Sequence, residues 1–242
     1  MITITPSTDA DGTTGSVRTD GAAPDTARVT WPVAGIVAGV AGLVAGMAGM
    51  ASITEEQYLE GPTVISELER GSYHVSFVLG LVSVAALFIA AAGWRRWAQH
   101  RAADDLAAGT IATALTATAT INIIGYSLAG ALGLYLEGGM DGGTVSDEAL
   151  FVNFAYLDFG TLFGWWGAML AAGCMAFLAF RRRVLPRWMG IVSVATMVLP
   201  VGLALFSSLP GMPGFFMPLW LVITSTGMVF SRTAGATAGV HR

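Results

Sequence analysis

Residues 73–96 read YHVSFVLGLVSVAALFIAAAGWRR, and this stretch contains the pattern that decides the fold. Residues 73–94 include no Asp, Glu, Lys or Arg, and two arginines follow them directly. An apolar helix of roughly 20 residues crosses about 30 Å of hydrocarbon. Arginine beside the end of such a helix favours the cytoplasmic side. The stretch therefore predicts a membrane span that ends in the cytoplasm.

The composition of the whole chain is typical of an integral membrane protein. Of its 242 residues, 54% are hydrophobic and 12% are charged, whereas about 25% are charged in an ordinary soluble domain. Such a chain has too few polar groups to cover a water-facing surface, so the lipid bilayer is its predicted partner. Its basic residues do not alternate with aromatic ones, and no nucleic-acid partner is expected.

Six apolar runs are long enough, or nearly so, to cross a membrane. They are residues 31–52, 73–94, 106–136, 159–180, 188–209 and 212–230. The predicted fold class is all-α, a polytopic membrane protein with six transmembrane helices packed as a bundle. We expect a disordered cytoplasmic tail over residues 1–30, a transmembrane domain over 31–231 and a short cytoplasmic tail over 232–242.

The arginines predict the orientation of these spans. With six crossings, eleven of the twelve basic residues fall on one side, and only Arg70 falls on the other. The loops on the side of Arg70 are acidic. Because cytoplasmic loops are enriched in arginine and lysine, both termini are predicted to be cytoplasmic. The predicted localisation is the plasma (inner) membrane, as a multi-pass protein.

The first outer loop is predicted to contain two short helices. Thr54 and Gln57 have the spacing of a capping box, which satisfies free amides at a helix start. Pro62 can open a second helix, with apolar residues on one face and Gly71 at its end. This acidic, amphipathic segment is expected to lie on the outer membrane surface.

Two spans have glycine along one face. Close backbone approach is the main source of helix association in lipid, and it needs small residues. The first set is Gly35, Gly39, Gly42, Gly46 and Gly49, and the second is Gly160, Gly164 and Gly167, continued by Ala171 and Cys174. We expect a helix-packing role for both sets, with the two helices central in the bundle. In one possible arrangement, these two helices pack against each other. The alternative is that glycine is merely common here, with 31 in the chain.

Few polar groups fall inside the predicted spans, and each could serve a ligand or ion path or the structure alone. Asn122 and Tyr126 share a face of the third span. Asn122 is expected to donate to a neighbouring carbonyl, with ligand binding as the alternative. Asp158 could exchange protons, unless its helix starts near Ser146 and places it in the headgroup layer. His74 is expected at the interface, with pairing to a carboxylate as the alternative. The chain has just three histidines, so no metal site is expected.

The entry to the fifth span, residues 183–190, reads RVLPRWMG. This segment resembles one in many uncharacterised six-span bacterial membrane proteins grouped as a domain of unknown function. The outer loop with short helices and the arginines after the second span are also similar to that family. The resemblance covers residues 31–231 and implies the six-span fold, without an established activity.

The sequence does not reveal an activity. It contains no phosphate loop, nucleophile elbow or metal-protease motif. The chain has no lysine, so it cannot form a Schiff base, and no cofactor is expected. We predict a structural or regulatory component without enzymatic activity, which binds a second copy or another membrane protein. The alternative is a small transporter or channel component that uses Asp158 and the polar face of the third span.

Overall fold

The computed structural model describes residues 27–50, 53–207 and 211–238, and within them the chain forms helices and loops but no strand. The helices are α1 (Ala27–Gly49), α2 (Glu55–Leu59), the 3-10 helix η1 (Gly61–Glu67), α3 (Arg70–Arg101), α4 (Leu106–Tyr135), α5 (Asp147–Phe163), α6 (Trp166–Phe177), the π-helix η2 (Leu178–Arg182), α7 (Arg187–Ser207) and α8 (Pro213–Ala238). The all-α fold class is confirmed.

In the described part of the chain, five helices are long and apolar enough to cross a membrane, namely α1, α3, α4, α7 and α8. The predicted fourth span differs, because the helix is interrupted at Gly164 and Trp165. The prediction of one continuous helix over 159–180 is therefore wrong. Instead, α5 begins at Asp147 with Ser146 as its cap, and α6 follows the interruption.

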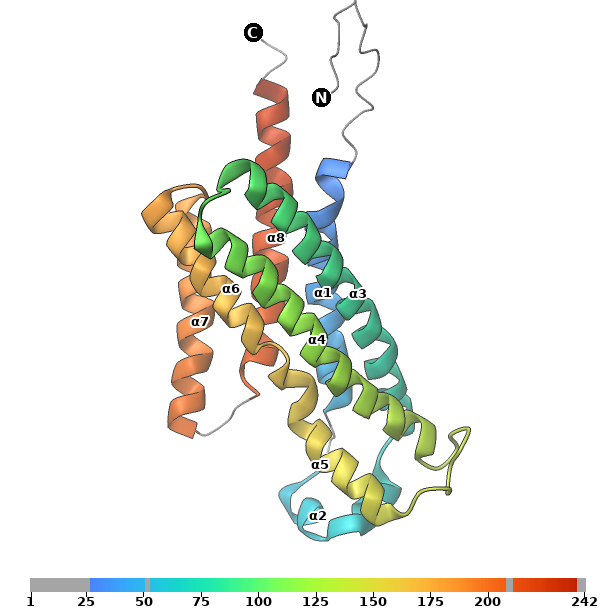
Figure 1. The fold of residues 1–242 in the computed structure, drawn as a ribbon. Helices are drawn as coiled ribbons and strands as arrows, with labels where there is room; N and C mark the ends of the chain where they lie inside the picture. Colours follow the sequence, from blue (N-terminus) through green and yellow to red (C-terminus); the bar gives the residue numbers. More distant parts are fainter. Residues whose placement is uncertain (1–26, 51–52, 208–210, 239–242) are drawn as a thin grey trace, which may run out of the picture.

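The helices form a ring in chain order. α1 packs on α3, α3 on α4, α4 on α5 and α6, α6 on α7, α7 on α8, and α8 returns to α1. α1 begins and α8 ends at the same end of the bundle, where the α3–α4 and α6–α7 connections also lie (Figure 1). α2, η1 and the α4–α5 loop lie at the opposite end, which we call the outer end.

The α1–α3 contact includes two hydrogen bonds between side chain and backbone. Ser83 Oγ donates to the Ala38 carbonyl and Ser76 Oγ donates to the Ala45 carbonyl, both at 2.8 Å. The two serines are seven residues apart, as are their acceptors, so the bonds lie on the same side of two antiparallel helices. All four residues are buried. The pairs therefore fix the register of α1 against α3.

The glycines of α1 lie against the rest of the chain. A Cβ atom on Gly39 would come within 2.5 Å of the Pro218 carbonyl oxygen in α8. Gly35 meets Ser225 of the same helix, and Gly46 lies 3.4 Å, measured from an added Cβ, from Leu162. The main partners of α1 are α3 and α8, and its contact with α5 is small. The arrangement in which the two glycine-lined spans pack chiefly against each other is therefore wrong.

The outer helices α2 and η1 pack on the protein itself. The capping box is confirmed, since Thr54 Oγ1 accepts from the Gln57 N–H and Gln57 Oε1 accepts from the Thr54 N–H. η1 ends at Glu67 rather than at Gly71. Its buried residues Val64 and Ile65 belong to a cluster with residues of α4 and α5. The expectation that this segment lies on the membrane surface is wrong for its apolar face.

The lone outer arginine has a structural role. Arg70 Nε donates to the Gly133 carbonyl at 2.8 Å, in the last turn of α4. The last carbonyls of a helix have no partner within it and attract positive charge. Arg70 therefore caps α4 from the start of α3.

The predicted tails lie mostly outside the described residues. Of residues 1–30, the structure describes 27–30, which already belong to α1. α8 continues to Ala238, so residues 232–238 of the predicted C-terminal tail are helical.

Candidate functional site at the helix break

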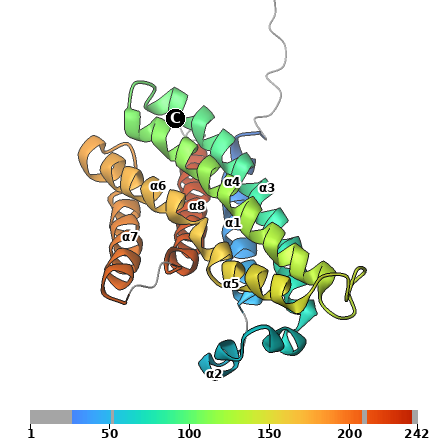
Figure 2. The ribbon, with the colours of Figure 1, turned by 60° about the horizontal axis from the view of Figure 1, so that its bottom comes forward.

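The break between α5 and α6 faces the polar residues of α4. Gly164 and Trp165 keep helical backbone angles, but the regular hydrogen-bond pattern stops between Phe163 and Trp166. Figures 1 and 2 both show α5 and α6 following each other along α4 with a change of direction between them. At about 1.5 Å per residue, Asn122 lies about 24 Å from the start of α4 and about 20 Å from its end. The break is therefore opposite the middle of a long helix.

The Asn122 side chain lies directly against the break. Its amide occupies the position where a Cβ on residue 164 would stand, so only glycine fits there. Asn122 is fully buried, and among the described residues neither its Nδ2 nor its Oδ1 has a hydrogen-bond partner. The prediction that Asn122 donates to a neighbouring carbonyl is therefore wrong. An unpaired buried polar group costs about 1–3 kcal/mol.

The neighbours of Asn122 on the same face of α4 are already paired. Thr118 Oγ1 donates to the Ala114 carbonyl at 3.0 Å, and a Cβ on Gly167 would come within 2.6 Å of that hydroxyl. Tyr126 lies with its ring against Gly80 of α3. These contacts bring α3 and α6 close to α4 on either side of Asn122.

Tyr126 and Trp165 connect the break to α1. The Tyr126 hydroxyl donates to the Gly42 carbonyl at 3.5 Å. Trp165 is fully buried and lies against Gly42, where a Cβ would also come within 2.8 Å of Ser83 Oγ. Four helices therefore meet here.

A second unpaired group lies farther out between the same helices. Asn153 Nδ2 donates to the Leu128 carbonyl of α4 at 3.4 Å, and its Oδ1 is buried without a partner. Together with the two atoms of Asn122, it completes the set of buried unpaired side-chain atoms in the described part of the chain. All three lie between α4 and the α5–α6 pair, which we call the α4–α5/6 seam.

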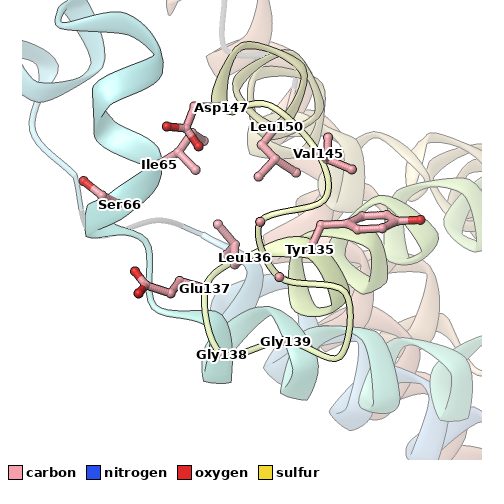
Figure 3. Close-up of a pocket in the computed structure, with 12 residues that line it drawn as sticks. Ile65, Ser66, Tyr135, Leu136, Glu137, Gly138, Gly139, Val145, Asp147 and Leu150 are labelled. Atoms are coloured by element: carbon pink, nitrogen blue, oxygen red, sulfur yellow. The ribbon is translucent and has the colours of Figure 1, made fainter.

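The outer end of the seam opens into a pocket of about 440 Å³. Figure 3 shows Tyr135 and Leu136 from the end of α4 and Leu150 from the start of α5 around it, with Glu137 and Asp147 at separate edges. Asn122 does not line this pocket, and α4 and α5 also carry buried apolar residues of one cluster. Among these are Leu132, Phe154 and Leu157.

Glu148 lies in the first turn of α5, next to this pocket. Its own backbone N–H and the Ser146 hydroxyl hydrogen-bond to the carboxylate and lower the pKa of Glu148 below its usual value. The first turn of a helix also favours negative charge. Glu148 therefore keeps its negative charge to a lower pH than an ordinary glutamate does.

Two predicted site residues are not part of the seam as described. His74 is exposed near the outer start of α3, where its backbone contacts Gly133. Asp158 lies in α5, and its side chain is outside the described residues, as are the surroundings of Gly160. Gly49 is buried at the end of α1.

Sequence reasoning missed the break itself, Asn153 and the two serines of α3. Asn153 was visible as a polar residue in an apolar segment, and Ser76 and Ser83 as a pair spaced by seven. A metal site needs at least three ligands from histidine, cysteine, aspartate or glutamate side chains, and no such group of three occurs in the described residues.

Comparisons with protein families, with curated proteins and with solved structures found no match to this chain. The resemblance to six-span proteins of unknown function stays a prediction.

Proposed function

We propose that this is a six-crossing protein of the plasma (inner) membrane, with both termini in the cytoplasm and α5–α6 as one interrupted crossing. The common position of the α1 start and the α8 end supports an even number of crossings (Figure 1). Arginines concentrate at that same end, in the last two turns of α3 and at the α6–α7 turn, as the cytoplasmic side requires.

Reporter fusions test this topology. A phosphatase active only outside the cytoplasm and a protein fluorescent only inside it would be fused after Asp104, Gly143 and Pro186. We expect fluorescence from the first and third fusions and phosphatase activity from the second. The same reporter signal at Gly143 and Pro186 would contradict a crossing by α5–α6.

As its activity, we propose passage of a small hydrogen-bonding solute along the α4–α5/6 seam. The observation that carries this proposal is Asn122, fully buried near the middle of the bundle with both amide atoms unpaired. In a bilayer such groups are costly and tend to mark solute paths. Interrupted helices near the membrane midplane are also the usual sites of substrate binding in transporters.

The chemistry of the seam favours a neutral solute. Its described polar residues, Thr118, Asn122, Tyr126 and Asn153, carry no charge, so they would not compensate an ion for its lost hydration. Asn122 can both donate and accept, which suits water, urea or a small polyol. Because Asn122 is sealed from solvent, the structure corresponds to a closed state, and passage requires movement at the break.

Solute flux in liposomes tests the proposal. The full chain would be reconstituted, and entry of water, urea and glycerol followed by stopped-flow light scattering. We expect Asn122→Leu to reduce the flux above the protein-free rate by at least about tenfold, since an amide supplies the path's central hydrogen bonds. Ser83→Ala is the control, because it removes a structural hydrogen bond worth about 0.6 kcal/mol and should keep the flux.

Two results would overturn the transport proposal. One is wild-type flux of all three solutes at the protein-free rate, and the other is unchanged flux in Asn122→Leu. Either would favour the role of a non-enzymatic structural or regulatory component that binds a second copy or another membrane protein. That role would need a surface other than the α1 glycines, since α8, Leu162 and Trp165 lie against Gly35, Gly39, Gly42 and Gly46.

A further inference from the structure

The turn between α6 and α7 carries four arginines within seven residues, Arg181, Arg182, Arg183 and Arg187, and all four are exposed. The π-helix η2 ends at Arg182, and the residue that caps it, Arg183, adopts left-handed backbone angles with φ of 55°. The N–H groups of Arg183 and Val184 both donate to the Leu178 carbonyl. This widened cap, rather than a regular helix, sets where the arginines stand.

Arg182 is engaged within the protein. Its Nε lies 2.7 Å from Asp105 Oδ2, and its guanidinium lies 5.9 Å from the centre of the Phe177 ring. Asp105 in turn accepts from the Ala107 N–H and caps α4. The pair therefore joins the α6–α7 turn to the α3–α4 turn.

The other three arginines of this turn differ from Arg182. Within the described residues, Arg181, Arg183 and Arg187 take part in no ion pair. Beside them, Phe180 and Trp188 are 46% and 41% exposed. Exposed aromatic rings next to arginine are typical of the membrane interface, where rings face the acyl chains and charges face the headgroups.

We propose that Arg181, Arg183 and Arg187 form a binding site for an anionic phospholipid that carries two phosphate groups. Guanidinium groups bind phosphate oxygens in pairs of parallel hydrogen bonds. The three positive charges on this short turn match a headgroup with two phosphate groups better than a headgroup with a single phosphate. Basic pockets at the cytoplasmic ends of membrane helices bind such headgroups.

The α3 arginines provide a matched control. Arg95, Arg96 and Arg101 are equally numerous and exposed at the same end of the bundle. Because they belong to one regular helix, with about 100° between successive residues, they are spread around it and cannot converge on one headgroup. Replacing them removes the same charge without removing the proposed site.

The test is native mass spectrometry of the full chain, released from detergent with cardiolipin, phosphatidylglycerol or phosphatidylcholine added. We expect the triple substitution Arg181→Gln, Arg183→Gln and Arg187→Gln to weaken cardiolipin binding by roughly a hundredfold, from about fivefold per arginine. The α3 triple to Gln should change it by less than about threefold, for the geometric reason above. Inorganic phosphate at millimolar concentration should not displace the lipid.

Three outcomes would overturn the proposal. They are equal losses in the two triple variants, equal binding of phosphatidylglycerol and cardiolipin by the wild type, and displacement by inorganic phosphate, which would indicate a site for the free anion.

A variant with lysine at all three positions keeps the positive charge and the orientation of the protein in the membrane. It should still lose several-fold in affinity, because lysine cannot form paired hydrogen bonds with phosphate, and wild-type affinity in this variant would also contradict the site.

Discussion

Replacement of Gly164 by alanine tests the close contact at the helix break. The added Cβ would overlap the Asn122 side-chain amide, and the next nearest atom is the Asn122 backbone nitrogen at 3.1 Å. Overpacking of a buried contact costs up to about 3 kcal/mol, and glycine-to-alanine exchange in a helix gains up to about 1 kcal/mol. We therefore expect Gly164→Ala to lower the free energy of unfolding by about 2 kcal/mol.

The double variant separates this contact from any general effect of the substitution. In an Asn122→Ala background the overlapping amide is gone, and the nearest contact known to remain is that with the backbone nitrogen of residue 122 at 3.1 Å. There, Gly164→Ala should be neutral or stabilising. The cycle should give a coupling of about 2–3 kcal/mol between the two positions, within the range found for residues in contact.

Gly202 of α7 is the control position, because nothing lies within 4 Å of an added Cβ there. Gly202→Ala should leave stability unchanged or raise it by up to about 1 kcal/mol. Reversible unfolding in mixed micelles, followed by circular dichroism, measures all four variants. A coupling below about 0.5 kcal/mol would refute the packing of Asn122 on Gly164, since distant sites add within that margin.

Three further predictions concern positions outside the break. Ser76→Ala and Ser83→Ala should each lower the free energy of unfolding by about 0.6 kcal/mol, roughly additively, because each removes one interhelical hydrogen bond; a loss in only one of them would argue against their shared register role. Asp105→Ala should lower the free energy of unfolding by about 1 kcal/mol or more, because α4 loses its cap. Since Asp105 and Arg182 form one ion pair, the double variant with Arg182→Gln should lose less stability than the sum of the two single losses; full additivity would contradict that pair. Because its pKa is lowered in the folded protein, Glu148 contributes stability at pH values above the ordinary carboxyl pKa of 4.5. That stability is lost as the pH falls through the folded-state pKa. Glu148→Gln should remove this part of the pH dependence in an unfolding titration below pH 5, and an unchanged profile would contradict the lowered pKa.

Much of the fold could be predicted from the sequence because lipid makes local demands on each segment. A crossing needs a long apolar run whatever its neighbours are, and α1, α3, α4, α7 and α8 follow the predicted runs closely. The capping box at Thr54 involves residues three apart, so its spacing alone was sufficient.

The candidate site could be predicted only in part. Asn122 and Tyr126 were recognisable because a polar residue in an apolar run is conspicuous, and a spacing of four puts both on one face of a helix. Whether Asn122 has a partner depends on which helix lies opposite, which no local pattern specifies. The packing of Gly35 and Gly39 on α8 could not be predicted for the same reason, since small residues permit close approach without selecting the partner.

The sequence by itself determined the lipid environment of this protein, the positions of its five long apolar helices and the end of the bundle at which its described arginines gather, because hydrophobicity and charge act on each segment separately. Tertiary structure alone decided the order of helices around the ring, the interruption opposite Asn122 and the pairing of Arg182 with Asp105. These features depend on contacts between residues far apart in the chain, and many different neighbours would satisfy the same apolar faces.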